Sequence, residues 1–204
     1  MNIMERFFNT AGPNQADTEY TIDPLTRVNL DEIMHLIEQK KYFVLHAPRQ
    51  TGKTSMLLAL RNFLNKSGRF CCVYVNIEPA QAARNNVDSA VGCCCEIIAD
   101  EIDALSDTPK YMDAYFSQFK KMDENSRLRL FLSYISGDLG KPFILFIDEI
   151  DAVVGDSLVS ILRQLRSGYE KRPSLFPQSV ILCGVRDVRD YRIVLSNRWG
   201  ERVP

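Results

Sequence analysis

The chain has 204 residues, 46% of them hydrophobic, which is enough for one substantial core. Its 25 basic and 26 acidic residues nearly cancel, so overall charge does not indicate a nucleic acid or an anionic membrane as partner. No apolar run approaches membrane-spanning length, and the first residues lack a secretory pattern. We therefore expect a cytoplasmic protein with a single domain over residues 1–204.

The first elements that the sequence predicts are a helix and a strand. Asn29 can cap the helix, with Glu32 three residues later as its reciprocal partner. Ile33 and Ile37 then recur at helical spacing and give this helix an apolar face. The apolar run that follows predicts the first core strand over Tyr42–His46.

A phosphate-binding loop follows this strand. The segment Ala47–Thr54 reads Ala-Pro-Arg-Gln-Thr-Gly-Lys-Thr, although the general pattern has glycine in place of Ala47. Gly52 allows close backbone approach, Lys53 places a positive charge on the β- and γ-phosphates, and the Thr54 hydroxyl can ligate Mg²⁺. Backbone N–H groups and the start of the next helix favour the anion. The nucleotide-binding residues predicted here are Pro48, Arg49, Gln50, Thr51, Gly52, Lys53, Thr54 and Ser55.

A helix, a strand and a long helical segment come next. Apolar spacing predicts a helix from Lys53 to Lys66 with Gly68 as its stop, then a strand over 70–77. Residues 81–140 read as helical, with a break at 106–109. An aromatic stripe in this segment is expected to be core rather than a ligand site; it comprises Tyr111, Tyr115, Phe116 and Phe119.

The six cysteines are expected to be small buried hydrophobic residues. No Cys-x-x-Cys pair occurs, and both histidines are far away in the sequence. Adjacent cysteines point in different directions on a strand or helix, so three in a row make a poor chelate. In a cytoplasmic chain this pattern favours neither disulfides nor zinc.

Two adjacent acids end the next predicted strand. The run 142–147 is almost entirely apolar, which is typical of a strand buried on both faces. Asp148, at its carboxyl end, can hold Mg²⁺. Glu149 beside it can polarise an attacking water as a general base. These acids could instead cap the strand or the next helix, and Asp151 is expected to be solvated or a cap.

The last part of the chain adds a helix and a strand. Asp156 is expected to cap a helix that ends near Gly168. Arg163 and Arg166 are expected on the solvated face of this helix, and a role as arginine finger is their alternative. The run 179–185 predicts a further strand ending at Arg186. This arginine could sense or stabilise charge on the γ-phosphate, and its alternative role is a surface salt bridge.

The alternation of strands and helices predicts an α/β fold, specifically a three-layer α/β/α sandwich with a mainly parallel sheet. In such a sheet the carboxyl ends of the strands meet at one edge, where ligands bind. The phosphate loop and both acids are therefore expected to lie together at that edge.

With these motifs placed, the chain resembles the bacterial AAA-like domain ATPases, which are related to archaeal-type and STAND P-loop ATPases. The resemblance covers about residues 9 to 192 and is most specific in the Pro-Arg-Gln loop and in segment 186–191. It implies ATP and Mg²⁺ as cofactors, with the strand near Val180 between the loop strand and the metal-acid strand. It also implies that residues 20–27 lie near the adenine, with Glu149, Lys53 and Arg186 as catalytic residues.

The segment after Arg186 departs from this family, whose members continue into a further strand and usually a helical lid. We therefore expect a nucleotide-binding core without that strand and lid. Mg²⁺-dependent ATP hydrolysis coupled to conformational change is the leading interpretation, and a regulatory switch module with little turnover is the alternative. A small-molecule phosphotransferase is a weaker third. The expected partner is an unidentified protein or a second copy; nucleic acid is possible but unsupported.

Overall fold

The computed structural model describes residues 19–20, 22–46, 51–106 and 108–184. Helices and strands alternate along this part of the chain. Their order is η1 (Pro24–Arg27), α1 (Leu30–Glu38), β1 (Phe43–His46), α2 (Lys53–Lys66), β2 (Cys71–Asn76), η2 (Glu78–Ala83), α3 (Val87–Asp103), α4 (Tyr111–Ala114), the π-helical turn η3 (Tyr115–Phe119), α5 (Arg127–Asp138), β3 (Phe143–Asp148), η4 (Ile150–Ala152), α6 (Gly155–Ser167), η5 (Tyr169–Lys171) and β4 (Ser179–Gly184).

The four described strands form one parallel sheet in the order β1-β4-β3-β2. The strand near Val180 thus lies between the loop strand and the metal-acid strand, which confirms the predicted order. All six residues of β3 are buried, as its apolar sequence indicates. Among the described strands β1 is at an edge, and its Val44 is 41% exposed.

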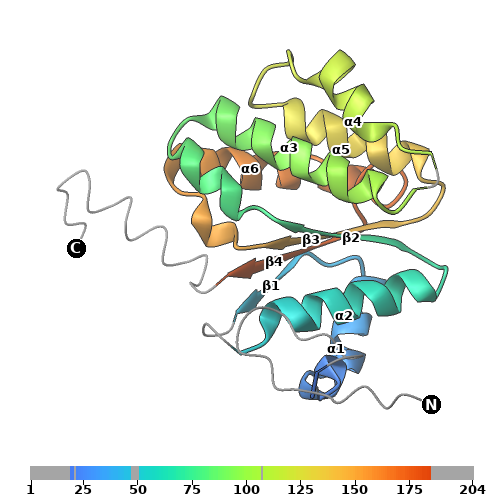
Figure 1. The fold of residues 1–204 in the computed structure, drawn as a ribbon. Coiled ribbons are helices and arrows are strands. Elements are labelled where there is room, and N and C mark those ends of the chain that lie inside the picture. Colours follow the sequence, from blue (N-terminus) through green and yellow to red (C-terminus); the bar gives the residue numbers. More distant parts are fainter. Residues whose placement is uncertain (1–18, 21, 47–50, 107, 185–204) are drawn as a thin grey trace, which may run out of the picture.

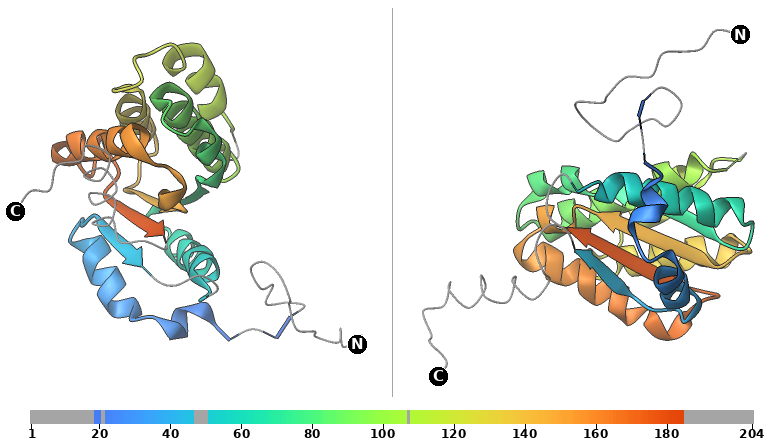
Figure 2. Two further views of the ribbon diagram at one scale, coloured as in Figure 1. Left: turned by 90° about the vertical axis from the view of Figure 1, so that its left-hand side faces the viewer. Right: turned by 90° about the horizontal axis from the view of Figure 1, so that it is seen from below.

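Helices cover both faces of the sheet and complete the expected three layers. Figures 1 and 2 show α1 and α2 on one face and α3, α5 and α6 on the other, with α4 beyond them. Two hydrophobic clusters fill the spaces between the layers. The cluster under α1 and α2 includes Ile37, Leu57, Leu60, Leu64, Ile144 and Phe146. The larger cluster, on the other face, includes Ile98, Phe131, Leu132, Phe143, Leu145 and Leu165.

Helix ends follow the sequence in two cases and depart from it in a third. The Asn29 side chain accepts from the Glu32 N–H at 3.2 Å, and Gly68 follows α2 with φ +70°. Asp156, however, is not the cap of α6, which begins at Gly155. The N–H of Asp156 donates to Asn85 Oδ1 at 2.6 Å. The prediction was wrong because a distant loop supplies this oxygen.

The aromatic stripe predicted in the helical segment is core at three of its four positions. Tyr111, Tyr115 and Phe119 are buried, whereas Phe116 is 47% exposed. Tyr111, Tyr115 and Phe119 recur at four-residue steps and share the buried face, whereas Phe116 directly follows Tyr115 and therefore projects from another side of the π-helical turn η3. Among the described residues no helix is both long and apolar enough to cross a membrane.

The large cluster depends on Phe131 in α5. Its fully buried ring lies 5.2 Å from that of Phe119 and 5.4 Å from that of Tyr115, centroid to centroid. Phe131→Ala is expected to lower the free energy of unfolding by about 3–5 kcal/mol, because it removes buried area and leaves a cavity. Urea unfolding followed by circular dichroism measures this change. The matched Phe63→Ala, at a site that is 43% exposed, should cost less than about 1 kcal/mol; equal losses would contradict the packing described.

Candidate functional site

The candidate site lies at the carboxyl edge of the sheet, where β1 leads toward α2. Residues 47–50, including Pro48, Arg49 and Gln50, lie outside the described part of the chain. Gly52 precedes α2 in the left-handed conformation, at φ +80°, which glycine adopts without strain. Lys53, Thr54 and Ser55 form the first turn of α2, and backbone N–H groups at such a helix start attract anions.

Asp148 connects this helix start to the centre of the sheet. Its carboxylate is 1% exposed, and the Thr54 hydroxyl donates to its Oδ2 at 2.9 Å. These residues are 94 positions apart in the chain, so only the fold brings them together. The N–H of Glu149 donates to the other oxygen, Oδ1, at 2.9 Å. The two residues predicted to hold Mg²⁺ therefore lie in direct contact.

Two further side chains surround Asp148 that sequence reasoning did not identify. The Tyr74 hydroxyl, from β2, donates to Asp148 Oδ2 at 3.0 Å. On the other side, in β4, burial and then the charge of Asp148 raise the pKa of the Cys183 thiol to about 12, so it remains a neutral thiol. Only the strand order, with β3 between β2 and β4, identifies these residues as neighbours of Asp148.

Glu149 has an unusual backbone and an unusual electrostatic environment. It adopts φ +55°, a left-handed conformation that costs a non-glycine residue roughly 1–2 kcal/mol. Partial burial raises its pKa, and the charges of Asp148 and Asp151 raise it further, against an opposing effect of Lys53. Strained residues with shifted pKa values are common where proteins carry out chemistry.

Arg27 approaches the phosphate loop from η1. A Cβ added to Gly52 would lie 2.9 Å from Arg27 Nη1, so the guanidinium lies directly over this glycine. Arg27 is exposed and pairs with no carboxylate among the described residues. The resemblance implied only that residues 20–27 lie by the adenine. The structure brings one of them to the loop itself.

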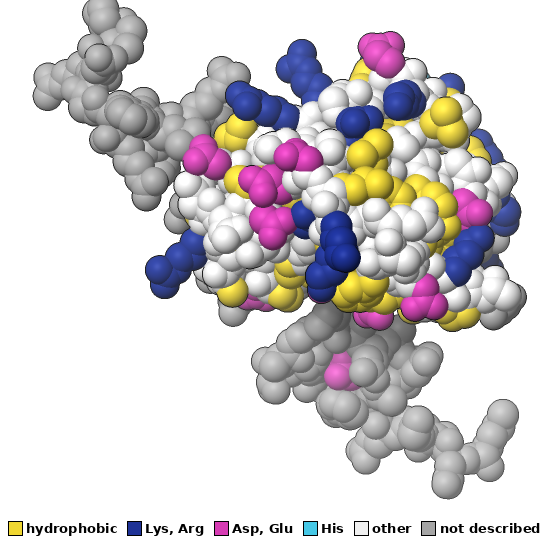
Figure 3. Space-filling model, turned by 90° about the horizontal axis from the view of Figure 1, so that it is seen from above, with side chains coloured by type: hydrophobic (Ala, Val, Ile, Leu, Met, Phe, Trp, Pro, Cys, Tyr) yellow, Lys and Arg dark blue, Asp and Glu magenta, His cyan; other side chains and the backbone are white. Residues whose placement is uncertain are grey.

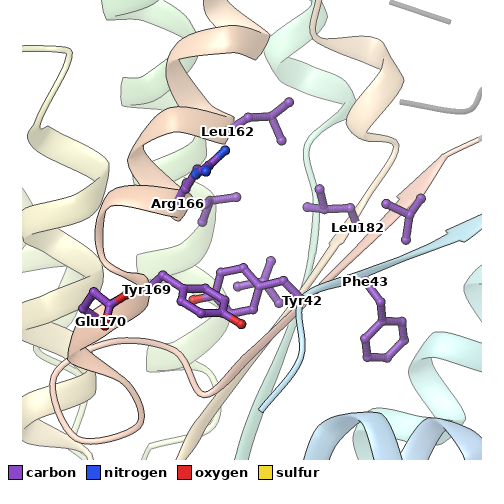
Figure 4. A pocket seen from close by; sticks show the side chains of 10 residues that line it. Tyr42, Phe43, Leu162, Arg166, Tyr169, Glu170 and Leu182 are labelled. Carbon is purple, nitrogen blue, oxygen red and sulfur yellow. The ribbon is translucent and has the colours of Figure 1, made fainter. Parts of the chain in front are cut away.

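Three other arginines are candidates for the nucleotide site in the sequence. Arg163 and Arg166 are exposed on α6, as predicted. Arg166 contributes to a groove of about 470 Å³ between β1, β4 and α6, where the rings of Tyr42 and Tyr169 meet edge to face (Figure 4). None of the residues predicted for the nucleotide site lines this groove. Arg186 lies outside the described residues.

The oxygen atoms gathered at Asp148 fit a hard divalent cation. Mg²⁺ prefers oxygen ligands and is usually held by one or two carboxylates together with substrate phosphates, rather than by an all-protein cage. Asp148 and Thr54 provide one carboxylate and one hydroxyl. Among the described residues, no group of three or more His, Cys, Asp or Glu side chains could hold a metal ion.

A parallel α/β sandwich with this loop, helix start and acid-ended strand is a P-loop NTPase fold. Residues 15–177 match the family model described as AAA-like domain, so the chain belongs to the AAA-like domain family. Family and fold together support a P-loop ATPase in general terms, with nucleotide binding as its chemistry. No curated protein sequence gave a significant match.

Two solved structures show the same fold at low sequence identity. A chain from the structure of Drosophila ORC bound to poly(dA/dT) DNA and Cdc6 has a TM-score of 0.53 and 10% identity, over 84% of this chain and 26% of that chain. Cdc6p from Pyrobaculum aerophilum has a TM-score of 0.51 and 15% identity, over 87% and 42%. The chain thus spans less than half the length of either.

The environment of Glu149 leads to a prediction about stability and pH. Because its pKa is raised, the folded protein holds this proton more tightly than the unfolded chain does. Ionisation therefore lowers the free energy of unfolding as the pH rises through that pKa. Glu149→Gln should be more stable than the parent near pH 8, and the difference should shrink as the pH falls toward about 4. Thermal unfolding across this pH range measures it.

Glu170→Gln is the matched control, because it makes the same substitution at an exposed position in η5. A constant offset between Glu149→Gln and the parent at every pH would contradict the electrostatic explanation.

Proposed function

We propose that this chain binds ATP with Mg²⁺ at the carboxyl edge of the sheet and hydrolyses it, coupling the reaction to a change of conformation. The observation that carries the proposal is the hydrogen bond from Thr54 to Asp148 at 2.9 Å. It joins the helix that follows the phosphate loop to the acid at the end of β3. A hydroxyl and a carboxylate in this arrangement hold Mg²⁺ in P-loop enzymes.

Each site residue has a distinct role in this proposal. Lys53 and the backbone N–H groups from Thr51 to Ser55 hold the phosphates, with Pro48, Arg49 and Gln50 completing the loop. Thr54 and Asp148 hold Mg²⁺, which neutralises phosphate charge when bound. Positioning and electrostatics of this kind supply most of the rate in phosphoryl transfer.

Glu149 is the proposed general base, and Arg186 the proposed sensor of the γ-phosphate. A carboxylate is a better base when its pKa is raised toward the working pH. Burial and the neighbouring acids raise the pKa of Glu149 in this direction. Glu149 directly follows Asp148 at the end of β3, and it is the backbone N–H of Glu149 that donates to Asp148.

The alternative is a regulatory module that switches partners with its bound nucleotide and turns over little. Switching requires only that a partner or ligand binds one state better than the other. The presence of Glu149 beside Asp148 favours hydrolysis, because a switch requires only the phosphate and metal contacts. A direct comparison of binding with turnover separates these two functions.

The helical layer formed by α3, α4 and α5 is the proposed surface for a protein partner or a second copy. Seen from above, this face carries basic and acidic side chains interspersed with hydrophobic ones (Figure 3). Phe116 in η3 and Leu105, just after α3, are among its exposed large hydrophobic side chains, at 47% and 49%. Such a mixed surface suits a protein better than the phosphate backbone of a nucleic acid, which requires a basic face.

Lys53→Ala tests the proposed phosphate contacts, and Glu149→Gln tests the proposed general base. Lys53→Ala should weaken Mg²⁺-ATP binding by about 10–100-fold, because it removes a charged hydrogen-bond donor. Glu149→Gln should bind nearly as well as the parent, while turnover falls by about 10²–10⁴-fold. Calorimetry measures binding, and phosphate release measures turnover.

Lys66→Ala, at the other end of α2, is the matched control for loss of a lysine from this helix. Binding without measurable turnover in the parent would support the switch module instead. Absence of Mg²⁺-ATP binding in the parent would overturn both functions.

Arg27 provides a separate test of where the nucleotide lies. Because its guanidinium lies over Gly52 without a carboxylate partner among the described residues, it is placed to contact an anionic ligand of the loop. Arg27→Ala should weaken ATP binding by about tenfold, the effect of one hydrogen bond to a charged group. Calorimetry checks this. The control Arg69→Ala removes an arginine that pairs with Glu38 on the surface and should leave binding unchanged.

A further inference from the structure

Tyr74 is a buried tyrosine whose hydroxyl points to the proposed metal acid rather than to solvent. Its side chain lies in the cluster beneath α1 and α2 and is 8% exposed. The hydroxyl donates to Asp148 Oδ2 at 3.0 Å. Burial, followed by the charge of Asp148, raises the pKa of Tyr74, so the group remains a donor throughout the working pH range.

Hydrogen bonds from three different elements fix the Asp148 carboxylate. Oδ2 accepts from Tyr74 in β2 and from Thr54 in α2, and Oδ1 accepts from the N–H of Glu149. Thr54 is itself a proposed metal ligand, whereas Tyr74 has no ligand role in the proposed reaction. Tyr74 is therefore a side-chain donor that can hold Asp148 whether or not a cation is bound.

We propose that Tyr74 is a positioning residue: its hydroxyl fixes the Asp148 carboxylate facing Thr54 and thereby makes the site selective for Mg²⁺ over Ca²⁺. This inference rests on the proposed function, because it concerns the cation that would accompany the nucleotide. The Tyr74 hydroxyl donates to Asp148, so its proposed contribution passes through the orientation of that carboxylate.

Ion selectivity follows from the different demands of the two cations. Mg²⁺ requires nearly ideal octahedral geometry at short distances, whereas Ca²⁺ accepts flexible geometry and longer bonds. A carboxylate held in one orientation therefore favours Mg²⁺. A carboxylate that is free to turn discriminates less between Mg²⁺ and Ca²⁺. Groups that orient metal ligands typically contribute about 10–100-fold to metal affinity or activity.

The variant Tyr74→Phe tests this role with little change in packing. The ring remains in the buried cluster, and Asp148 retains its bonds from Thr54 and Glu149, so the variant is expected to fold; its thermal transition checks this. Calorimetry with a non-hydrolysable ATP analogue, AMP-PNP, is carried out on the full chain in EDTA, in Mg²⁺ and in Ca²⁺. No turnover is involved in this measurement.

In the parent, Mg²⁺ should strengthen AMP-PNP binding more than Ca²⁺ does. In Tyr74→Phe we expect the enhancement by Mg²⁺ to fall by about tenfold, the enhancement by Ca²⁺ to fall less, and the affinity in EDTA to remain unchanged. The ratio of the two enhancements is the decisive quantity, because a general loss of structure would lower all three affinities together.

Tyr111→Phe is the matched control, because the buried Tyr111 likewise donates its hydroxyl to a carboxylate, at 2.6 Å from Asp138 Oδ2. This pair contains none of the proposed site residues, and its loss should leave all three affinities unchanged. An equal loss of AMP-PNP affinity in EDTA, Mg²⁺ and Ca²⁺ for Tyr74→Phe would show a purely structural role. Unchanged affinities would show that the hydrogen bond is dispensable. Either result overturns this inference but leaves the proposed function standing. If the parent gains nothing from Mg²⁺, the proposed metal-dependent function fails as well.

Discussion

The arrangement of the site depends on the hydrogen bonding of one buried carboxylate. Asp148 is 1% exposed at the end of a fully buried strand, where an ionised group without partners would be very costly. Thr54, Tyr74 and the N–H of Glu149 supply the donors that make this position tolerable. Because these come from α2, β2 and the turn after β3, the carboxylate requires the sheet order and the helix start to be correct together.

The two adjacent acids have opposite environments, which suits different roles. Asp148 is held by donors on both oxygens, whereas Glu149 has a strained backbone and a raised pKa. A raised pKa suits Glu149 to proton transfer, and fixed hydrogen bonds suit Asp148 to holding a cation. Gly52 also has a left-handed backbone near the site, but without cost, since it lacks a Cβ. Glu149 is one of three non-glycine residues with positive φ in the described part of the chain, together with Lys40 and Arg84.

Local patterns in the sequence predicted much of this fold. The helix from Lys53 to Lys66 was predicted with its bounds, and the fully apolar run before Asp148 indicated a strand buried on both faces. The family match confirms the resemblance to AAA-like proteins. Other features depend on contacts between distant segments. The N–H of Asp156 in the first turn of α6 donates to Asn85 from a distant loop, and Tyr74 reaches Asp148 only because β2 lies beside β3. The spacing of apolar residues within one segment does not indicate such contacts between distant segments.

This sharing of one carboxylate among several donors also determines which substitutions are informative. Removing Asp148 would leave the hydroxyls of Thr54 and Tyr74 without their common acceptor, so its effect would combine lost metal binding with the cost of unsatisfied buried groups. Removing the Tyr74 hydroxyl leaves the carboxylate with its bonds from Thr54 and from the N–H of Glu149, and changes mainly its orientation. Tyr74, which is not itself a proposed ligand, therefore reports on the function of Asp148 more cleanly than Asp148 does.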